Sequence, residues 1–335
     1  MSPSRPSIVL LAGEGTSSAV LYGLYDVLFS VGAIFADMTI GIPGSEALDV
    51  RIVSKDGKPF HCFGGIPVEP HAGMSAVTHC DLLVVCDSYS PIDRPPRAEY
   101  AIYSDWLRQR YAGGSMVTSV CSGTLVLAEA GLLDNRKAAS HWAYAELFAK
   151  EYPRVSLQRG SILCVTEEKD RIVTAGGVTS WQELALYIIA RFCGTEAALQ
   201  TAKVHLLSGH EQGQLPFAAI NRRVDPSDGV ITRCQEWIAV NYAAPNPVQA
   251  MTGLSGLPSR TFARRFQSAT GRSPINYVQA LRIEEAKQML ETSSSAIEDI
   301  SAEVGYQDSA AFRRTFRKLC GITPANYRRR FSRLV

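Results

Sequence analysis

Short apolar runs, separated by longer amphipathic stretches, fill the first part of the chain. Such runs stand at residues 8–12, 38–42, 82–86, 116–120 and 171–175. Runs this short indicate buried strands rather than helices. The stretches between them predict helices at 18–31, 97–111, 123–130, 142–150 and 180–192. Strands that alternate with helices predict a flavodoxin-like α/β domain, with a mainly parallel sheet and helices on both faces.

The pattern changes near Thr195, after which no apolar run predicts a strand. Residues 209–227 are polar with scattered Gly and Pro, a composition typical of a linker. Asp228 can then cap a helix whose apolar residues recur at helical spacing, namely Val230, Cys234, Trp237 and Ile238. We therefore expect an α/β domain at 1–208, a linker at 209–227 and an all-helical domain at 228–335.

The rear domain repeats itself at an offset of 50 residues. Phe262, Arg264, Phe266, Gly271, Pro274, Asn276 and Tyr277 recur as Phe312, Arg314, Phe316, Gly321, Pro324, Asn326 and Tyr327. Each copy predicts a short helix, a turn at Gly256 or Gly305, and a second helix whose phenylalanines share one inward face. Two such copies at a fixed offset favour two helix-turn-helix units over unrelated amphipathic helices.

The outward faces of the second helices carry the candidate DNA contacts. These are Arg260, Arg264 and Gln267 in the first unit and Ser309, Arg313, Arg314 and Arg317 in the second. Arginine can bind guanine O6 and N7 together, or hold phosphates. Charge agrees with this assignment, because residues 225–335 carry 15 Lys+Arg against 10 Asp+Glu while the remaining residues carry 19 against 22. The basic half is thus expected to face a polyanion.

Residues 228–331 resemble the DNA-binding domain of the AraC family of regulators. The likeness is densest from Ile297 to Arg328 and is repeated by the first unit from Gly256 to Phe262. The resemblance implies a seven-helix domain with two recognition helices in successive major grooves of one DNA face. Their sites would lie about one helical turn, ~34 Å, apart.

A candidate reactive cysteine lies between a predicted strand and a predicted helix of the front domain. Cys121 follows the run 116–120 and precedes Gly123, the layout of a nucleophile elbow, and His141 could approach it in space. The segment resembles the class I glutamine amidotransferase-like fold in its PfpI branch. With Ser140-His141-Trp142 it resembles the GlxA-type regulators still more closely. That likeness includes Gly176-Gly177 and the stretch Gly-Gln-Leu-Pro-Phe at 213–217.

Two departures set this chain apart from the hydrolytic members. Ser122 stands where they have His, and the strand end at 86–90 has no Gly-Gly turn to supply an oxyanion donor. A missing donor costs roughly 3–4 kcal/mol of transition-state stabilisation. We therefore expect no enzyme and assign no catalytic residue. Three roles for Cys121 stay open: an inert small residue, a ligand contact or redox sensor, and the nucleophile of a hydrolase or amidase.

The carboxyl ends of the predicted strands are the expected place for a ligand. The residues assigned to it are Cys121, Ser122, His141, Trp142, Glu14 and Gly177. The eight cysteines form no CxxC pair, so we expect neither a disulfide framework nor a metal site, and no cofactor. No run approaches the ~20 apolar residues of a membrane span. The sequence thus predicts a cytoplasmic, dimeric transcription factor that binds promoter DNA and a small-molecule effector.

Overall fold

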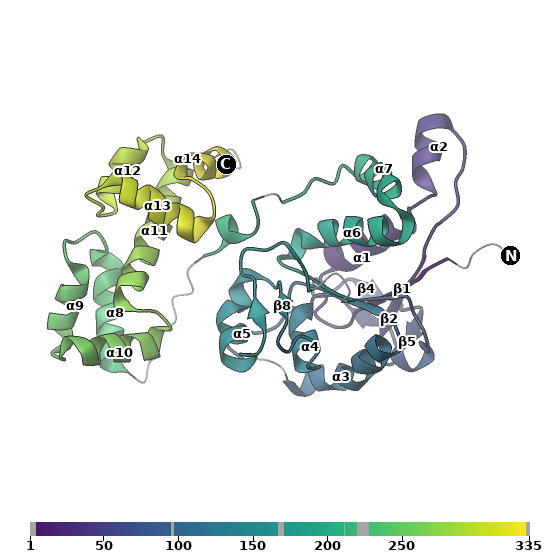
Figure 1. Ribbon diagram of the computed structural model, residues 1–335, viewed down its shortest axis with the longest axis horizontal. Helices are drawn as coiled ribbons and strands as arrows, with labels where there is room; N and C mark the ends of the chain where they lie inside the picture. The colour runs from purple at the N-terminus through teal and green to yellow at the C-terminus, as the bar shows by residue number, and fades with distance from the viewer. Residues whose placement is uncertain (1–4, 95–96, 167–170, 211, 220–227, 333–335) are drawn as a thin grey trace. The chain divides into compact units, whose positions relative to one another are not determined.

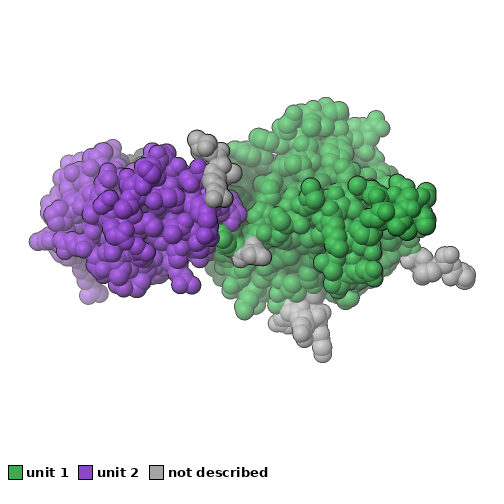
Figure 2. Space-filling view, turned by 90° about the horizontal axis from the view of Figure 1, so that it is seen from above, with its two compact units in different colours: residues 1–214 green, residues 215–335 purple. Residues whose placement is uncertain are grey.

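The computed structural model describes residues 5–94, 97–166, 171–210, 212–219 and 228–332. The chain folds into two compact units, residues 1–214 and 215–335 (Figure 1, Figure 2). The predicted linker at 209–227 falls across this division. Its described residues up to Gln214 belong to the first unit and those from Leu215 to the second, whereas 211 and 220–227 lie outside the described residues.

The first unit is built on a seven-stranded sheet with the order β10-β11-β7-β6-β1-β2-β5. The strands are β1 Ser7–Leu11, β2 Asp49–Ser54, β5 Ala72–Gly73, β6 Leu82–Val85, β7 Met116–Val120, β10 Leu163–Val165 and β11 Ile172–Ala175. Only β10 runs antiparallel to its neighbour. Two short ladders lie outside this sheet: β3 Phe60–His61 with β4 Pro67–Val68, and β8 Lys137–Ala138 with β9 Ser156–Leu157.

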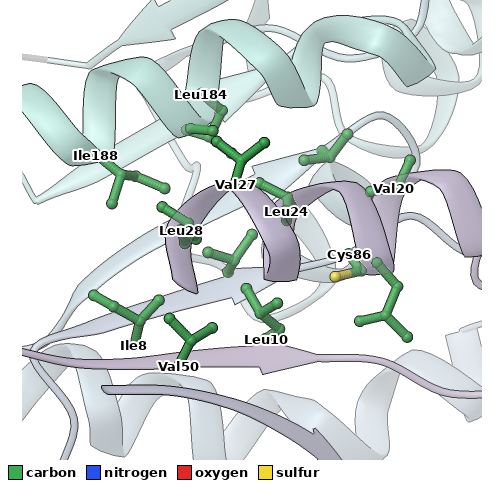
Figure 3. Packing of buried hydrophobic residues seen from close by; sticks show 14 of the residues in the cluster. Ile8, Leu10, Val20, Leu24, Val27, Leu28, Val50, Cys86, Leu184 and Ile188 are labelled. Carbon is green, nitrogen blue, oxygen red and sulfur yellow. The ribbon is translucent and has the colours of Figure 1, made fainter. Parts of the chain in front are cut away.

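Helices cover both faces of the sheet, as predicted. The α-helices of the first unit are α1 Ser18–Phe29, α2 Ile34–Ile40, α3 Arg97–Ala112, α4 Gly123–Glu129, α5 Ala145–Glu151, α6 Trp181–Cys193 and α7 Thr195–His205, of which α2 packs no buried side chain on the sheet. On one face, α1 lies between the sheet and α6, with Leu24 and Val27 packed between Leu10 and Leu184 (Figure 3). On the other face, Leu107, Leu125 and Phe148 bring α3, α4 and α5 into a second buried layer. The predicted flavodoxin-like α/β architecture is confirmed.

The strand predicted at 38–42 is wrong. The segment forms α2, which buries none of its side chains, and ends at Gly41 in the left-handed conformation. The second strand of the sheet is instead β2, which pairs in parallel with β1. Within the described residues no single helix is long and apolar enough to cross a membrane, although α1 and α2 together pass that test as a pair bent by 65°. An apolar run alone therefore did not identify a buried strand.

The described residues of the second unit form a short 3-10 helix, η4 Leu215–Phe217, followed by seven α-helices. The α-helices are α8 Gly229–Asn241, α9 Pro247–Ser255, α10 Ser259–Thr270, α11 Pro274–Thr292, α12 Ile297–Glu303, α13 Ser309–Cys320 and α14 Pro324–Phe331. The pairs α9–α10 and α12–α13 are the two predicted helix-turn-helix units, with the turn glycines Gly256 and Gly305 at φ +65° and +91°. Asp228 caps α8 as predicted, accepting a hydrogen bond from the Ile231 N–H.

Each helix-turn-helix unit has its own apolar core. Phe262 and Phe266 are buried in the first core, and Phe312 and Phe316 in the second. The long helix α11 contributes to both, with Val278 and Leu281 in the first core and Ile283, Ala286 and Leu290 in the second. The repeat seen in the sequence is therefore a repeat of two small cores joined by one shared helix.

Candidate functional site

Cys121 occupies a sharp turn between β7 and α4. Its φ of +55° lies in the left-handed region, which non-glycine residues rarely adopt. The turn is held by the Cys121 N–H, which donates to the Ala175 carbonyl at 3.0 Å, and by the Ser140 hydroxyl, which donates to the Cys121 carbonyl at 2.8 Å. Gly123 is required next to it, because a Cβ there would lie 2.5 Å from the Val85 carbonyl oxygen. The elbow geometry expected from the sequence is present.

The Cys121 thiol is buried in the elbow. Its residue is only 6% exposed. Burial, together with the nearby Asp87 carboxylate, raises the pKa of the Cys121 thiol to about 12. A thiol with such a pKa is almost entirely protonated at neutral pH, whereas nucleophilic and redox-sensing cysteines have lowered pKa values.

His141 lies near the elbow but does not activate it. Its Nδ1 accepts a hydrogen bond from the Ala143 N–H at 3.2 Å, which places the proton of the neutral ring on Nε2. Burial lowers the pKa of His141. The ring packs against Trp142 and Tyr144, with centroid distances of 5.0 and 6.3 Å. In the described part of the chain no hydrogen bond joins His141 to Cys121, so the Cys-His pair considered from the sequence is not assembled.

Ser122 binds the backbone N–H that a hydrolase would need as a free oxyanion donor, that of Ser88. Its hydroxyl donates to the Ser88 carbonyl at 2.6 Å and accepts from the Ser88 N–H at 2.9 Å. The backbone donor after β6 is thus already used inside the protein. An oxyanion hole requires donors aimed at the reacting oxygen, and this one points at Ser122 instead.

A cavity of about 570 Å³ opens beside the elbow. It brings together three of the predicted ligand residues, Cys121, Ser122 and His141. The carboxylates in its lining are Asp87, which is buried, and Asp93, which is exposed. Its other lining residues are Ser17, Phe63, Ser88, Tyr89, Ser90, Pro91, Ile92, Ala143, Tyr144 and Val178. This size is suited to a small organic ligand.

Asp87 is the buried charge of this cavity. Its carboxylate accepts hydrogen bonds from the N–H of Ser17, at 3.2 Å, and from the Ser17 hydroxyl. Burial raises the pKa of Asp87, and the hydrogen bonds from Ser17 oppose that rise. Asp87 thus has Ser17 as a hydrogen-bond partner and is also a lining residue of the cavity.

The other predicted ligand residues lie around this cavity rather than in it. Glu14 is exposed and lines a neighbouring cavity of about 520 Å³, which shares Asp87 and Ser88 with the first. Trp142 donates its backbone N–H to the Gln214 side chain at 3.1 Å. A Cβ on Gly177 would lie 3.8 Å from His141 Cδ2, so this glycine is close behind the histidine ring.

Sequence reasoning did not identify Ser17, Phe63, Tyr89 or Tyr144 as lining residues. Tyr144 follows His141 by three positions on one helical turn, and its hydroxyl donates to the Ser90 carbonyl at 3.0 Å. The spacing to His141 was the one local signal for it. Phe63 and Tyr89 come from separate loops and stack with a centroid distance of 5.0 Å, an association that no local pattern contains.

The first helix-turn-helix unit presents its predicted DNA contacts to solvent. Arg260, Arg264 and Gln267 on α10 are exposed, on the side opposite Phe262 and Phe266. The neighbouring Arg265 has a structural role, because its guanidinium makes two hydrogen bonds to the Asp228 carboxylate, at 3.1 and 2.7 Å.

The second unit presents the same plan with its cations partly neutralised. Arg313, Arg314 and Arg317 on α13 are exposed, and Ser309 at the start of the helix is half-buried. Arg313 forms an ion pair with Glu298 on α12. Arg314 lies 3.6 Å from the carboxylate of Asp308, the residue that caps α13.

Two family models match this chain. The model of the DJ-1/PfpI family matches residues 7–191, more than half of the sequence. The chain belongs to the DJ-1/PfpI family. A second model, of a helix-turn-helix domain, matches residues 253–330, which span the second unit and the first unit from the end of α9 onward. This DJ-1/PfpI protein therefore carries a helix-turn-helix domain behind its α/β domain.

Curated relatives match this chain over most of its length. The regulator CdhR of Pseudomonas aeruginosa is 27% identical over 83% of this chain and 81% of its own length. The regulator GlxA of Rhizobium meliloti is 25% identical over 75% of this chain and 76% of its own. Both are HTH-type transcriptional regulators by name. The resemblance to the GlxA type is confirmed, and the DJ-1/PfpI protein described here is a DNA-binding transcriptional regulator of that type.

The α/β domain also has relatives outside regulation. The isonitrile hydratase of Pseudomonas putida is 29% identical over 53% of this chain and 68% of its own length. Among solved structures, DJ-1beta of Drosophila melanogaster has a TM-score of 0.50 at 18% identity, covering 62% of this chain and all of its own, which shows a shared fold. The family fold thus serves both enzymes and regulators, and the site decides between them.

Proposed function

We propose that this regulator binds promoter DNA through α10 and α13 and binds a small-molecule effector in the cavity beside Cys121. One observation supports the proposal above others: two basic helix faces follow an α/β domain whose elbow thiol is protonated but borders an open cavity. A site without an activated nucleophile, in front of two helix-turn-helix units, suits sensing rather than turnover.

For the DNA-binding half, the proposed contacts are the seven residues already assigned on α10 and α13. The test is fluorescence anisotropy of the full chain with pooled promoter fragments across a salt series. We expect tight binding to few fragments, falling with salt, and weakened in the Arg313→Ala/Arg317→Ala double variant. The matched control is Arg191→Ala/Lys203→Ala, which removes two exposed cations from the first unit. Equal weakening by both pairs would contradict the proposed interface.

For the sensing half, the lining of the cavity indicates the charge of its ligand. Asp87 and Asp93 supply two carboxylates, and within the described chain no Lys or Arg lines the cavity. His141 is neutral near pH 7, since burial lowers its pKa. We therefore propose a neutral or cationic effector rather than an anion.

Thermal-shift measurements with small primary amines and carboxylic acids of matched size test this charge preference. We expect stabilisation by some of the amines, lost in Asp87→Asn and retained in Asp105→Asn, whose carboxylate is exposed on α3. Stabilisation by the acids, unaffected by Asp87→Asn, would contradict a site that selects against anions.

We propose that Cys121 acts neither as a nucleophile nor as a redox sensor, and that the protein is not an enzyme. Relative to the ordinary thiol pKa of 9.0, a pKa of about 12 reduces the thiolate fraction about a thousandfold near neutral pH. We expect iodoacetamide to label Cys121 at least about a hundredfold more slowly in folded than in urea-unfolded protein at pH 8. Fast labelling of the folded chain, or turnover of an amide or isonitrile that Cys121→Ala abolishes, would favour the enzymatic alternative.

We also propose that the protein is a homodimer and, because its partner is chromosomal DNA, that it is cytoplasmic. Met38, Ile40 and Ile42 are 58–68% exposed around α2, an apolar surface of the kind that oligomers bury. Light scattering of the wild-type chain should give twice the mass of one chain. Met38→Glu/Ile40→Glu should shift it toward the monomer, and an unchanged dimer would place the contact elsewhere.

A further inference from the structure

The stretch Gly-Gln-Leu-Pro-Phe at 213–217 is anchored at both of its ends. Gln214 is 3% exposed, and its side chain uses three hydrogen-bonding positions inside the first unit. The amide oxygen accepts from the Trp142 N–H at 3.1 Å, and the amide nitrogen donates to the carbonyls of Ser140 at 2.8 Å and Ser161 at 3.0 Å. A side chain bound in this way is part of the α/β domain, not of a free linker.

Two partners of Gln214 flank a residue that lines the proposed effector cavity. Ser140 and Trp142 flank His141, so two hydrogen bonds of Gln214 hold the backbone on either side of that lining residue. Ser140 also binds the Cys121 carbonyl through its hydroxyl. Gln214 therefore positions the segment that carries His141, and through Ser140 it is linked to the elbow.

The close packing around Gln214 requires glycine at two positions. A Cβ on Gly176 would lie 2.5 Å from the Gln214 amide nitrogen. A Cβ on Gly213, whose φ is +68°, would lie 2.3 Å from the Gly160 carbonyl oxygen. The backbone approaches too closely at both positions for any larger residue.

Phe217, three residues after Gln214, is bound within the second unit. Its ring contacts Phe331 of α14 edge-on at 5.4 Å, and the Arg330 guanidinium lies 4.7 Å from the ring centroid. The next carbonyl, of Ala218, accepts a hydrogen bond of 2.6 Å from the Lys287 ammonium of α11, whose side chain is 8% exposed. Phe331 packs against the core of the second helix-turn-helix unit.

The chain between the two anchors is short and coiled. Leu215–Phe217 form one turn of 3-10 helix, in which the Ala218 N–H donates to the Leu215 carbonyl at 3.1 Å. Such a turn spans about 6 Å, and three fully extended residues span at most about 11 Å, so a larger displacement of Gln214 unwinds the turn and then shifts or releases Phe217. Space for such a movement exists, because a cavity of about 430 Å³ borders Phe217 and is lined also by Lys287, Tyr327 and Phe331.

We propose that Gln214 and Phe217 couple the effector cavity to the second helix-turn-helix unit. Movement of the segment around His141 changes the anchoring of Gln214, and with it the packing of Phe217 on α11 and α14. The coupling deepens the proposed function and rests on it. Because a coupling free energy is reciprocal, loss of the Phe217 contacts should destabilise the anchoring of Gln214 by the same free energy as loss of the Gln214 contacts destabilises the packing of Phe217.

Hydrogen exchange of the full chain tests the coupling without an effector. Phe217→Ala removes the ring contacts, and its side chain is 42% exposed, so folding should be preserved. We expect the Trp142 amide, which is bonded to Gln214, to exchange about fivefold faster in this variant, or ~1 kcal/mol at 25 °C. The matched control, Leu199→Ala on α7, removes a similarly exposed apolar side chain and should leave Trp142 unchanged. Unchanged exchange in Phe217→Ala would overturn the proposal.

A second variant, and the same exchange measurement with DNA bound, distinguish failure of this proposal from failure of the function on which it rests. Gln214→Ala should accelerate exchange in α14, and a melting curve reports whether that variant is folded. Binding of the promoter fragment selected by anisotropy should slow Trp142 exchange in the wild type but not in Phe217→Ala. If that variant binds DNA and its Trp142 responds like the wild type, the coupling is wrong and the regulator stands. If neither the wild type nor Phe217→Ala binds DNA, but the Trp142 amide exchanges faster in Phe217→Ala, the coupling stands and the proposed function is wrong.

Discussion

The two helix-turn-helix units share a structural template but differ in how their cations are balanced. Arg260 and Arg264 of α10 have no ion-pair partner among the described residues, whereas Arg313 and Arg314 of α13 pair with Glu298 and Asp308. The repeat has kept the buried phenylalanines and the turn glycines while the charges have diverged. The core therefore defines the shape of each unit, and the charges determine how readily each can bind a polyanion.

The largest effect should come from the cores that the two units have in common. Phe266→Ala and Phe316→Ala each remove a fully buried ring, and each should lower the free energy of unfolding by about 3–5 kcal/mol. Urea titrations followed by circular dichroism measure both. Ile275→Ala, on an exposed position of α11, should change it by less than about 0.5 kcal/mol. A cost confined to one phenylalanine would mean that the two cores are not equivalent.

The next effect should separate the two units in DNA binding. Arg264→Ala should weaken binding to the selected promoter fragment by about 1–3 kcal/mol, and Arg313→Ala by less. The reason is that Arg313 must give up its ion pair with Glu298 to bind DNA, which offsets part of its gain. Anisotropy titrations at one salt concentration compare them. Glu298→Gln should then tighten DNA binding slightly, because it frees Arg313. A larger loss of binding free energy in Arg313→Ala than in Arg264→Ala would contradict the view that the ion pair weakens the contribution of the second unit.

Helix capping provides a smaller contrast. Asp308 accepts hydrogen bonds from the Ala310 and Ala311 N–H groups at 2.8 and 3.1 Å, whereas the corresponding residue of the first unit, Pro258, makes no side-chain cap. Asp308→Ala should therefore cost about 1 kcal/mol of stability. Pro258→Ala removes no cap hydrogen bond, so urea unfolding should show a smaller loss. Equal losses would mean that the Asp308 cap contributes little.

The smallest of these effects should be a loss of stability of both helix-turn-helix units at acid pH. The hydrogen bonds from Arg265 lower the pKa of Asp228. The pKa of Glu298 is lowered chiefly by the backbone N–H of Glu298 itself and then by the hydrogen bond from Arg313. A lowered carboxyl pKa stabilises the fold above the unfolded-state pKa, and this contribution is lost as the pH falls through the folded-state value. Stability should thus fall below about pH 4.5, and Asp228→Asn should flatten part of that slope. An identical slope in wild type and variant would remove Asp228 from the explanation.

How much of this structure could be predicted depended on whether the signal was local. The helix-turn-helix units were predictable because each one is defined by spacings within about 20 residues and occurs twice. Strands β1, β6, β7 and β11 were predictable as short apolar runs. Strand β2 was missed because charged residues interrupt it, with Arg51 exposed between Val50 and Ile52. The run at 38–42 misled because its apolar residues lie on an exposed helix.

The site was predictable only as far as the elbow motif extends. Cys121, Ser122 and His141 lie within 21 residues of one another and share the cavity. Glu14 was assigned from its place after β1, yet the loop turns it toward the neighbouring cavity. The resemblance singled out the stretch 213–217 that contains Gln214. The role of Gln214 could not be predicted, because its partners are backbone groups of distant residues and any residue type supplies such groups.

Helix α11 restricts which changes in length this domain can tolerate. Its 19 residues span about 28 Å, and they contribute to both cores. Inserting or deleting a single residue would shift one unit by about 1.5 Å and rotate it by about 100° relative to the other. Insertions and deletions should therefore be absent from α11 in functional descendants of this gene, while the turns on either side can vary in length. The length of α11 thus sets the separation and rotation of the two helix-turn-helix units, and simultaneous binding in successive major grooves would depend on both.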